Sequence, residues 1–153
     1  MQDITKIAPD MPNSGNVLEG VSTAAQPRKE DLQKLGEAGY KTVLDLRTPA
    51  EDRGFDEPDA VRRAGMEYVN LPVSPDALDD DTFDRFREFI KEPDNRPVLV
   101  HCSSATRVGA LLLPHLILDE GSTREEAVDL TSKVGLANEE LRRRALRYVD
   151  ERQ

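Results

Sequence analysis

Residues 101–107 bring a thiol and a guanidinium close together, in the order His-Cys-Ser-Ser-Ala-Thr-Arg. The thiolate form of Cys102 is a nucleophile, and the planar fork of Arg107 can bind two oxygens of a tetrahedral anion. The residues between them are small or carry a hydroxyl: Ser103, Ser104, Ala105 and Thr106. Small side chains leave successive backbone N–H groups accessible, so this segment predicts a phosphate-binding loop with a nucleophile at one end.

A strand before the loop and a helix after it are expected to hold these groups in place. Residues 97–101 are apolar apart from His101 and have the composition of a buried strand. A helix is expected to follow the loop and to run to about residue 119. Its N-terminus carries a partial positive charge, which favours both a bound anion and the thiolate of Cys102.

The other elements alternate between strands and helices. Strands are expected at residues 17–22, 42–46 and 67–71, and helices at 27–38, 60–64, 80–90, 123–134 and 139–149. The pattern from Ser122 to Glu125 predicts a capping box for the fourth of these helices, and Asn138 is expected to cap the fifth. This order predicts an α/β fold of three layers (α/β/α), with helices on both faces of a mostly parallel central sheet. Residues 1–16 are expected to form an N-terminal arm and residues 17–153 a single domain. Cys102 then lies at the carboxyl end of its strand, where ligands bind in such folds.

The composition limits the partners and the compartment. The chain of 153 residues has a net charge of −9, with 33% charged and 37% hydrophobic residues. Nucleic acids and anionic membrane surfaces repel such a chain, so neither is expected as a partner. Its single cysteine excludes an internal disulfide. The first residues lack the basic start and apolar run of a signal peptide, which predicts a cytoplasmic protein, or a periplasmic one if a leader was removed.

Hydrolysis of a phosphate ester also needs an acid that protonates the leaving oxygen. Asp76 is the best candidate, because it lies in the expected loop between the strand at 67–71 and the next helix. A solvent-exposed loop residue without a catalytic role is the alternative interpretation of Asp76. The nearby Asp79, Asp80 and Asp81 instead suit the cap and first turn of that helix.

Four other polar residues are interpreted mainly as structural. Asp45 is expected to bond a loop amide or to pair with Arg47, although its place near a strand end also allows it to face the site. Arg47 is expected to pair with Asp45 or Glu51. His101 points away from the site if its strand is regular, and it could brace the loop through the backbone. His115 is expected to be a buried, hydrogen-bonded residue of the helix that follows the loop.

The sequence resembles the phosphatase-like domain at the N-terminus of beta-lactamase-hydrolase-like proteins, a family related to the dual-specificity and tyrosine phosphatases. The resemblance covers about residues 17–148. Its landmarks in chain order are residues 22–27, 42–47 with Glu51, 68–73 and 101–107. The resemblance implies a protein-tyrosine-phosphatase-like fold, a phosphocysteine intermediate, and no metal or other cofactor. It also implies that Cys102 is the nucleophile and that Arg107 binds the phosphate and stabilises the transition state.

The loop departs from the tyrosine phosphatase pattern at three points. It has four residues between Cys102 and Arg107, one fewer than in those enzymes, and rhodanese-type sulfurtransferases use a loop of this length. Val108 stands where tyrosine phosphatases have Ser or Thr, whose hydroxyl helps the thiolate to leave the phosphocysteine. Ala105 replaces a glycine that is common inside the loop. These departures predict slow turnover, unless a hydroxyl within the loop substitutes.

Three functions therefore stay open at the level of sequence. The first is a cysteine-dependent phosphatase of phosphate monoesters, whose partner is a small phosphorylated substrate or a phosphoprotein. The low aromatic content of 5% and the acidic charge favour the small substrate. The second is a rhodanese-like sulfurtransferase that carries a persulfide on Cys102. The third is a non-catalytic module that binds phosphate through the same loop.

Overall fold

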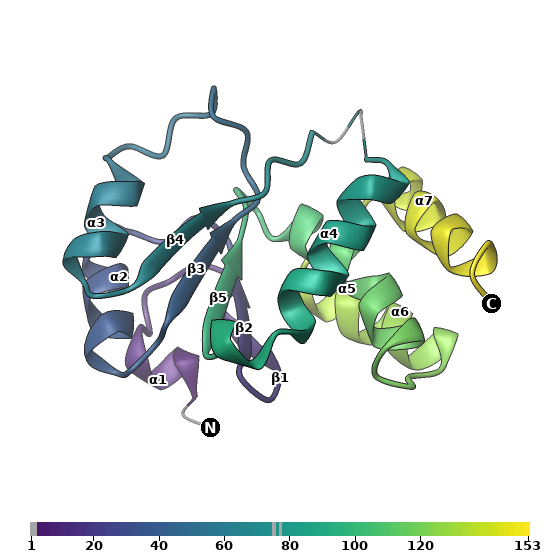
Figure 1. Cartoon of the computed structure of the whole chain (residues 1–153), viewed down its shortest axis with the longest axis horizontal. Coiled ribbons are helices and arrows are strands. Elements are labelled where there is room, and N and C mark those ends of the chain that lie inside the picture. The colour runs from purple at the N-terminus through teal and green to yellow at the C-terminus, as the bar shows by residue number, and fades with distance from the viewer. Residues whose placement is uncertain (1–2, 75, 77) are drawn as a thin grey trace.

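The computed structural model describes residues 3–74, residue 76 and residues 78–153 (Figure 1). The elements in chain order are α1 (Ile4–Ile7), β1 (Gly15–Leu18), β2 (Val21–Ala24), α2 (Lys29–Glu37), β3 (Thr42–Asp45), α3 (Glu57–Arg63), β4 (Glu67–Asn70), α4 (Asp80–Lys91), η2 (Pro93–Asn95), β5 (Val98–His101), α5 (Thr106–Leu118), α6 (Arg124–Val134) and α7 (Glu139–Asp150). None of the helices in these ranges combines the length and the apolar character needed to cross a membrane.

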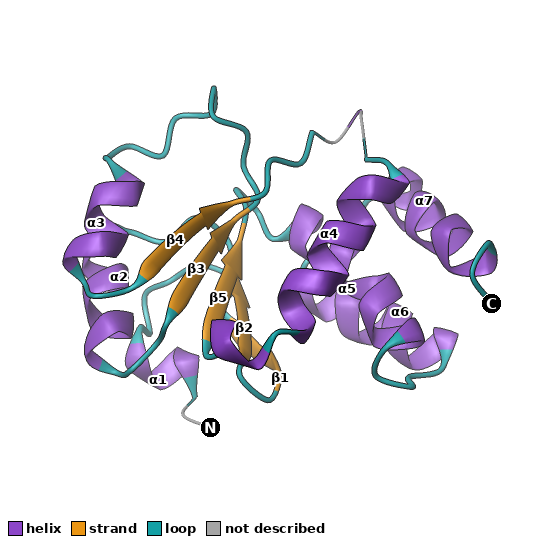
Figure 2. Cartoon of the chain, in the orientation of Figure 1, coloured by secondary structure: helices purple, strands orange, loops and turns teal. Residues whose placement is uncertain are grey.

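A five-stranded sheet in the order β1-β2-β5-β3-β4 forms the centre of the fold. The pairs β2–β5, β5–β3 and β3–β4 are parallel, and only the edge strand β1 is antiparallel to its neighbour. Helices α1 to α3 lie on one side of the sheet and α4 to α7 on the other (Figure 2). The expected layered α/β fold with a mostly parallel sheet is thus confirmed.

The alternation of side chains along β5 separates two hydrophobic cores. Val98 and Val100 pack with the helices α4 to α7, whereas Leu99 packs with the helices α1 to α3. Successive side chains of a strand point to opposite faces, so Cys102 lies on the same face as Val98 and Val100, and His101 on the same face as Leu99. This alternation places the thiol against α5 and the imidazole against α3, on opposite sides of the sheet.

The N-terminal part differs from the expectation in two respects. Residues 17–22, expected as one strand, are a hairpin in which β1 and β2 meet at Gly20 with φ of 79°. Glycine adopts this left-handed conformation without steric cost, which permits the reversal. Within the segment expected to be an arm, α1 forms, and Ile4, Ala8 and Met11 are buried in the core beneath α2 and α3.

The helix caps agree with the expectation at two positions and shift at a third. Asp79 caps α4 by accepting a hydrogen bond from the backbone of Thr82, and Asn138 caps α7 in the same way. The capping box of α6 pairs Thr123 with Glu126, one residue later than the Ser122–Glu125 pattern expected from the sequence.

Candidate active site

Cys102 directly follows β5, and its side chain is completely buried. The loop 102–105 then leads into α5, which begins at Thr106 at the carboxyl edge of the sheet (Figure 1). The N-terminal end of α5 is therefore close to Cys102 in the chain, and its partial positive charge favours a bound anion at this point. The buried strand, loop and helix expected around residues 101–107 are present.

The loop backbone is shaped by Ala105, which has φ of 73° and ψ of 0° in the left-handed region. This conformation turns the chain into α5 at the N-cap position. Among the described residues, none accepts a hydrogen bond from the backbone N–H of Ser103, Ser104 or Ala105. The absence of a protein acceptor is a requirement of the predicted anion-binding role of these N–H groups.

The turn between α6 and α7 supports the loop from outside. The hydroxyl of Thr106 donates a hydrogen bond to the carbonyl of Gly135, at 3.2 Å. A side-chain carbon on Gly135 would lie 3.0 Å from Cβ of Ala105 and 3.2 Å from the carbonyl oxygen of Ser104. Since Gly135 also has φ of 143°, only glycine allows this close approach without strain.

We expect replacements of Ala105 to reveal how its left-handed conformation and its contact with Gly135 affect stability. An L-residue in the left-handed region costs roughly 1–2 kcal/mol, which Ala105→Gly relieves, while the freer unfolded chain costs about 0.4–1 kcal/mol. Ala105→Gly should therefore leave the free energy of unfolding within about 1 kcal/mol of the parent value. Ala105→Val should lower it clearly, because a β-branched side chain resists this conformation and crowds Gly135. Urea unfolding measures both; a valine variant as stable as the parent would contradict the strain argument.

The guanidinium of Arg107 is held beside the loop by hydrogen bonds, and 7% of the residue is exposed. Its Nη1 and Nη2 each donate to one carboxylate oxygen of Glu51, both at 2.8 Å. Nη1 also donates to the carbonyl of Val73 at 3.1 Å, and Nη2 to Oγ of Ser103 at 3.1 Å. Two parallel hydrogen bonds to a carboxylate fix the plane of the guanidinium. The fork thus faces Glu51 in a defined orientation, and Nη2 also reaches Ser103 of the loop.

The ion pair shifts the pKa of both partners. The hydrogen bonds to Glu51 raise the pKa of Arg107, and the field of the Cys102 sulfur adds to this effect despite burial, which opposes it. The hydrogen bonds from Arg107 hold the pKa of the Glu51 carboxyl far below its ordinary value. The sequence named Glu51 as a landmark and as a partner of Arg47, but its bond to Arg107 was missed because nothing in the spacing indicates it.

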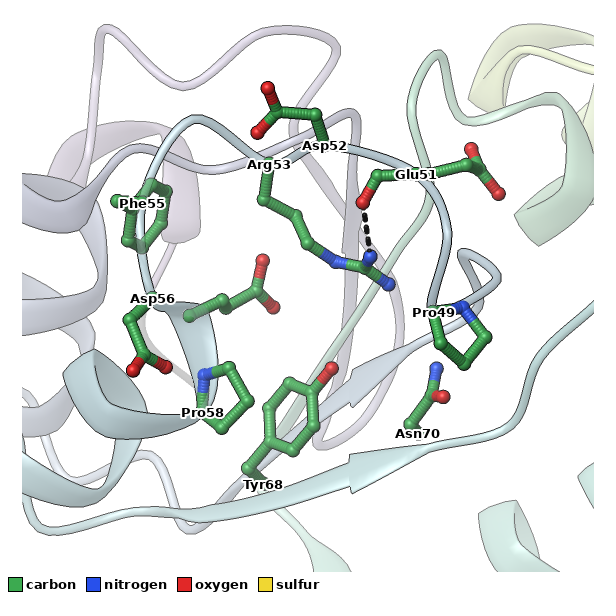
Figure 3. A pocket seen from close by; sticks show the side chains of 10 residues that line it. Pro49, Glu51, Asp52, Arg53, Phe55, Asp56, Pro58, Tyr68 and Asn70 are labelled. Atoms are coloured by element: carbon green, nitrogen blue, oxygen red, sulfur yellow. Dashed lines mark hydrogen bonds between the residues drawn. The ribbon is translucent and has the colours of Figure 1, made fainter.

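The loop between β3 and α3 is organised to present Glu51. Arg47 donates to Oε1 of Glu51 at 3.1 Å, as expected from the sequence, and the backbone N–H of Thr48 donates to Oε2 at 2.7 Å. Arg53 donates to the backbone carbonyls of Arg47, Thr48 and Glu51. Figure 3 shows the Arg53 guanidinium inside the loop and the Glu51 carboxylate turned away from it. Arg53 therefore holds the backbone of the loop whose Glu51 carboxylate binds Arg107.

A buried polar cluster lies on the opposite side of the sheet from Cys102. His101 is fully buried, with Nε2 at 2.6 Å from Glu57 and Nδ1 at 3.3 Å from the carbonyl oxygen of Cys102. Asp45 accepts a hydrogen bond from the backbone of Arg47 and forms an ion pair with Arg53 at 2.8 Å. The structural interpretation of Asp45 is confirmed, and His101 braces the loop backbone as expected.

Asp45, Glu57 and His101 also form the one group of possible metal ligands found among the described residues, with ligand atoms within 4.8 Å of one another. Each carboxylate is already engaged by protein donors. Tyr68 and Arg53 donate to Asp45, at 2.6 and 2.9 Å, and the side-chain amide of Gln26 donates to Glu57 at 2.6 Å. The positive charge of Arg53 beside the group also disfavours a cation. The arrangement therefore fits a hydrogen-bonded support for the loop.

A hollow of about 440 Å³ lies beneath the β3–α3 loop (Figure 3). It is lined by Pro49, Glu51, Asp52, Arg53, Phe55, Asp56, Glu57, Pro58, Tyr68 and Asn70. The polar groups of Arg53 and Tyr68 that reach its floor are bound to Asp45. The hollow therefore borders the buried cluster, and Glu51 in its lining also binds Arg107.

The two other residues with an expected role lie away from the fork. Asp76 is exposed between β4 and α4, and lines a groove of about 450 Å³ with residues of α4 and α7. It forms no hydrogen bond with the described residues of the loop 102–107. The structure thus brings Cys102, Ser103 and Arg107 together without Asp76. His115 is buried and bonded to Asp119 and Glu120, each at 3.0 Å, which confirms its structural role.

Solved structures share this fold. A DUF442 protein of Shewanella putrefaciens CN-32 has a TM-score of 0.81 with 19% identity, over 97% of each chain. The core catalytic domain of a PP-IP phosphatase of S. cerevisiae has a TM-score of 0.80 with 19% identity, over 93% of this chain and 88% of that one. The chain therefore has the fold of these two proteins.

The family follows from sequence similarity. The model of the family "DSP-PTPase phosphatase fused to NAD+ Kinase" matches residues 13–147, and the chain belongs to this family. A beta-lactamase hydrolase-like protein of Agrobacterium fabrum is 29% identical over 117 residues, which confirms the resemblance expected from the sequence. That match covers 74% of this chain and 27% of the relative. The chain thus spans about a quarter of the length of the curated relatives it matches.

Proposed function

We propose that this chain is a cysteine-dependent phosphatase that hydrolyses phosphate monoesters. One observation supports the proposal: the Cys102 thiol, the N–H groups of the loop and the guanidinium of Arg107 lie together at the start of α5. In the first step Sγ of Cys102 attacks phosphorus, the ester oxygen leaves with a proton, and a phosphocysteine forms. In the second step water attacks phosphorus, inorganic phosphate is released and the thiolate is restored.

Charge develops on the non-bridging oxygens of phosphate during both steps. The guanidinium of Arg107 is held by Glu51 before the substrate arrives, so it and the N–H groups of Ser103 to Ala105 stabilise this charge with little reorganisation. The hydrogen bond between Arg107 and the exposed Ser103 can be exchanged for one to a phosphate oxygen. The bonds to Glu51 can then keep the guanidinium in its plane.

Asp76 is proposed as the acid that protonates the leaving oxygen on the basis of its place in the sequence between β4 and α4; in the structure it lies away from Arg107, in the groove beside α4 and α7. Asp76→Asn should slow the hydrolysis of an alkyl phosphate by about 10²-fold, because general acid catalysis contributes on this order. It should hardly change the hydrolysis of nitrophenyl phosphate, whose leaving group needs little protonation. Steady-state rates on both substrates measure the difference.

Asp79→Asn is the matched control for this prediction. Asparagine caps a helix as well as aspartate does, so α4 should stay intact while the same charge is removed nearby. If Asp76→Asn slows both substrates equally, or Asp79→Asn reproduces its effect, Asp76 is not the acid.

A direct assay distinguishes the proposal from its rivals. Purified protein is given nitrophenyl phosphate in one experiment, and thiosulfate with cyanide in another. Release of nitrophenol without formation of thiocyanate is expected. Thiocyanate alone would identify a sulfurtransferase with a Cys102 persulfide. Binding of phosphate without either product would identify a non-catalytic module.

The substrate is proposed to be a small phosphorylated molecule. The net charge of −9 disfavours a large acidic partner, and an aromatic content of 5% provides few surfaces for a phosphotyrosine ring. Comparing kcat/KM for a sugar phosphate and for a phosphotyrosine peptide tests this. A higher value for the peptide would overturn the proposed class.

A further inference from the structure

We propose that Gln26 is a positioning residue that links the support of Cys102 to the support of Arg107. The proposal rests on the proposed function where it is tested by catalytic rates. Phosphate affinity is a second measurement that does not depend on catalysis. Gln26 follows β2, whose register sets Ala24 beside His101 of β5. It therefore lies next to the loop without belonging to it.

Four hydrogen bonds fix Gln26 between the two supports. Its backbone N–H donates to the carbonyl of Ser103 at 3.4 Å, which extends the pairing of β2 and β5 into the loop. Its side-chain Nε2 donates to Glu57 at 2.6 Å and to the carbonyl of Pro27 at 3.0 Å. Its Oε1 accepts from Nη1 of Arg47 at 2.9 Å. The half-buried side chain thus uses both ends of its amide.

The nitrogen end of the amide acts on the side of the nucleophile. Glu57 is fully buried and binds His101 with its other oxygen, at 2.6 Å. His101 in turn lies 3.3 Å from the carbonyl of Cys102. A hydrogen bond from Gln26 therefore sets the position of Glu57, and through His101 the backbone that carries the thiol.

The oxygen end acts on the side of the anion-binding fork. Arg47, whose Nη1 is held by Gln26, donates through Nε to Oε1 of Glu51 at 3.1 Å. The same oxygen of Glu51 accepts from Nη2 of Arg107 at 2.8 Å. Displacing Arg47 therefore moves the carboxylate that orients Arg107.

Only an amide satisfies both neighbours, because one is a carboxylate and the other a guanidinium. Gln26→Glu keeps an acceptor for Arg47 but sets a carboxylate against Glu57. Gln26→Met has a similar shape and removes both the donor and the acceptor. The two variants thus separate the two sides of the link, and Gln33→Met on the exposed face of α2 is the matched control.

The test measures kcat and KM for nitrophenyl phosphate, and the affinity for inorganic phosphate by titration calorimetry. Gln26→Met should weaken phosphate binding and lower kcat/KM by about 10- to 100-fold, because small displacements of reacting groups cost rates of this order. Gln26→Glu should lower kcat while phosphate affinity stays within about twofold of the parent value. Gln33→Met should change neither quantity.

A double-mutant cycle with Glu51→Gln distinguishes positioning from general loss of stability. If Gln26 acts through Glu51, adding Gln26→Met to Glu51→Gln should weaken phosphate binding much less than it does in the parent chain. If the fold-losses in phosphate affinity of the two single variants simply multiply in the double variant, the residues act independently and the proposal is overturned. A Gln26→Met variant that keeps the parent affinity and kcat would overturn it as well. Should the parent chain bind phosphate without hydrolysing the ester, the proposed function fails while the affinity cycle still decides the role of Gln26.

Discussion

Cys102→Ser should abolish the hydrolysis of nitrophenyl phosphate while leaving the affinity for phosphate nearly unchanged. The loop N–H groups and Arg107, which are proposed to hold the anion, are untouched by this change. The hydroxyl is a far weaker nucleophile than the thiolate, and removing a covalent nucleophile lowers kcat by more than about 10³-fold in other enzymes. Phosphate release and titration calorimetry on the same preparation measure the two quantities.

Cys102→Ala is the control for this first prediction, since it removes the reacting atom without adding a hydroxyl. Both variants should be equally inactive. If Cys102→Ser keeps the parent rate, the nucleophile is another group. If both variants lose phosphate binding as well, the buried side chain of Cys102 is needed to shape the loop itself.

Arg107→Ala should weaken phosphate binding and turnover together, because it removes charge from the ground state and from the transition state. Removing a single preorganised donor costs about 10²–10³-fold in kcat in other enzymes, so the loss in kcat/KM should be at least of this size. Arg107→Lys should restore little, since an ammonium cannot reproduce the two parallel bonds to Glu51.

The chain offers a matched control at the opposite end of α5. Arg87 also forms two hydrogen bonds with one carboxylate: its Nε and Nη2 donate to Asp119, both at 2.8 Å, whereas Arg107 binds Glu51 through Nη1 and Nη2. Arg87→Ala should lower the free energy of unfolding without changing phosphate affinity. If both alanine variants reduce phosphate affinity alike, the effect of Arg107 is one of stability, and its assignment as an anion-binding residue is wrong.

The sequence predicted the part of the site that is local in the chain. The apolar run before Cys102 and the helix after Arg107 carry their own signals, because strand and helix periodicities are visible over a few residues. Asp79 and Asn138 likewise cap helices as expected, since capping depends on nearby backbone groups. The family landmarks added the expectation of a protein-tyrosine-phosphatase-like fold around this loop.

The sequence could not predict the contacts between distant segments. Glu51 lies in a loop without periodicity, and its carboxylate meets Arg107 only because Arg53 holds that loop in shape. Gln26 was visible as a landmark, but its role depends on three contacts to separate segments. The two-residue turn at Gly20 was missed because a short apolar run fits one strand as well as a hairpin.

The ion pair between Glu51 and Arg107 determines how the site responds to acid. Because the pKa of Glu51 is lowered in the folded protein, the unfolded chain takes up this proton first as the pH falls. The stability that the pair contributes is present above the ordinary pKa of a glutamate. It is lost as the pH falls from that ordinary pKa toward the lower pKa that Glu51 has in the folded protein. Molecules that stay folded in mild acid therefore keep the guanidinium fixed, so acid should inactivate this part of the site by unfolding the chain.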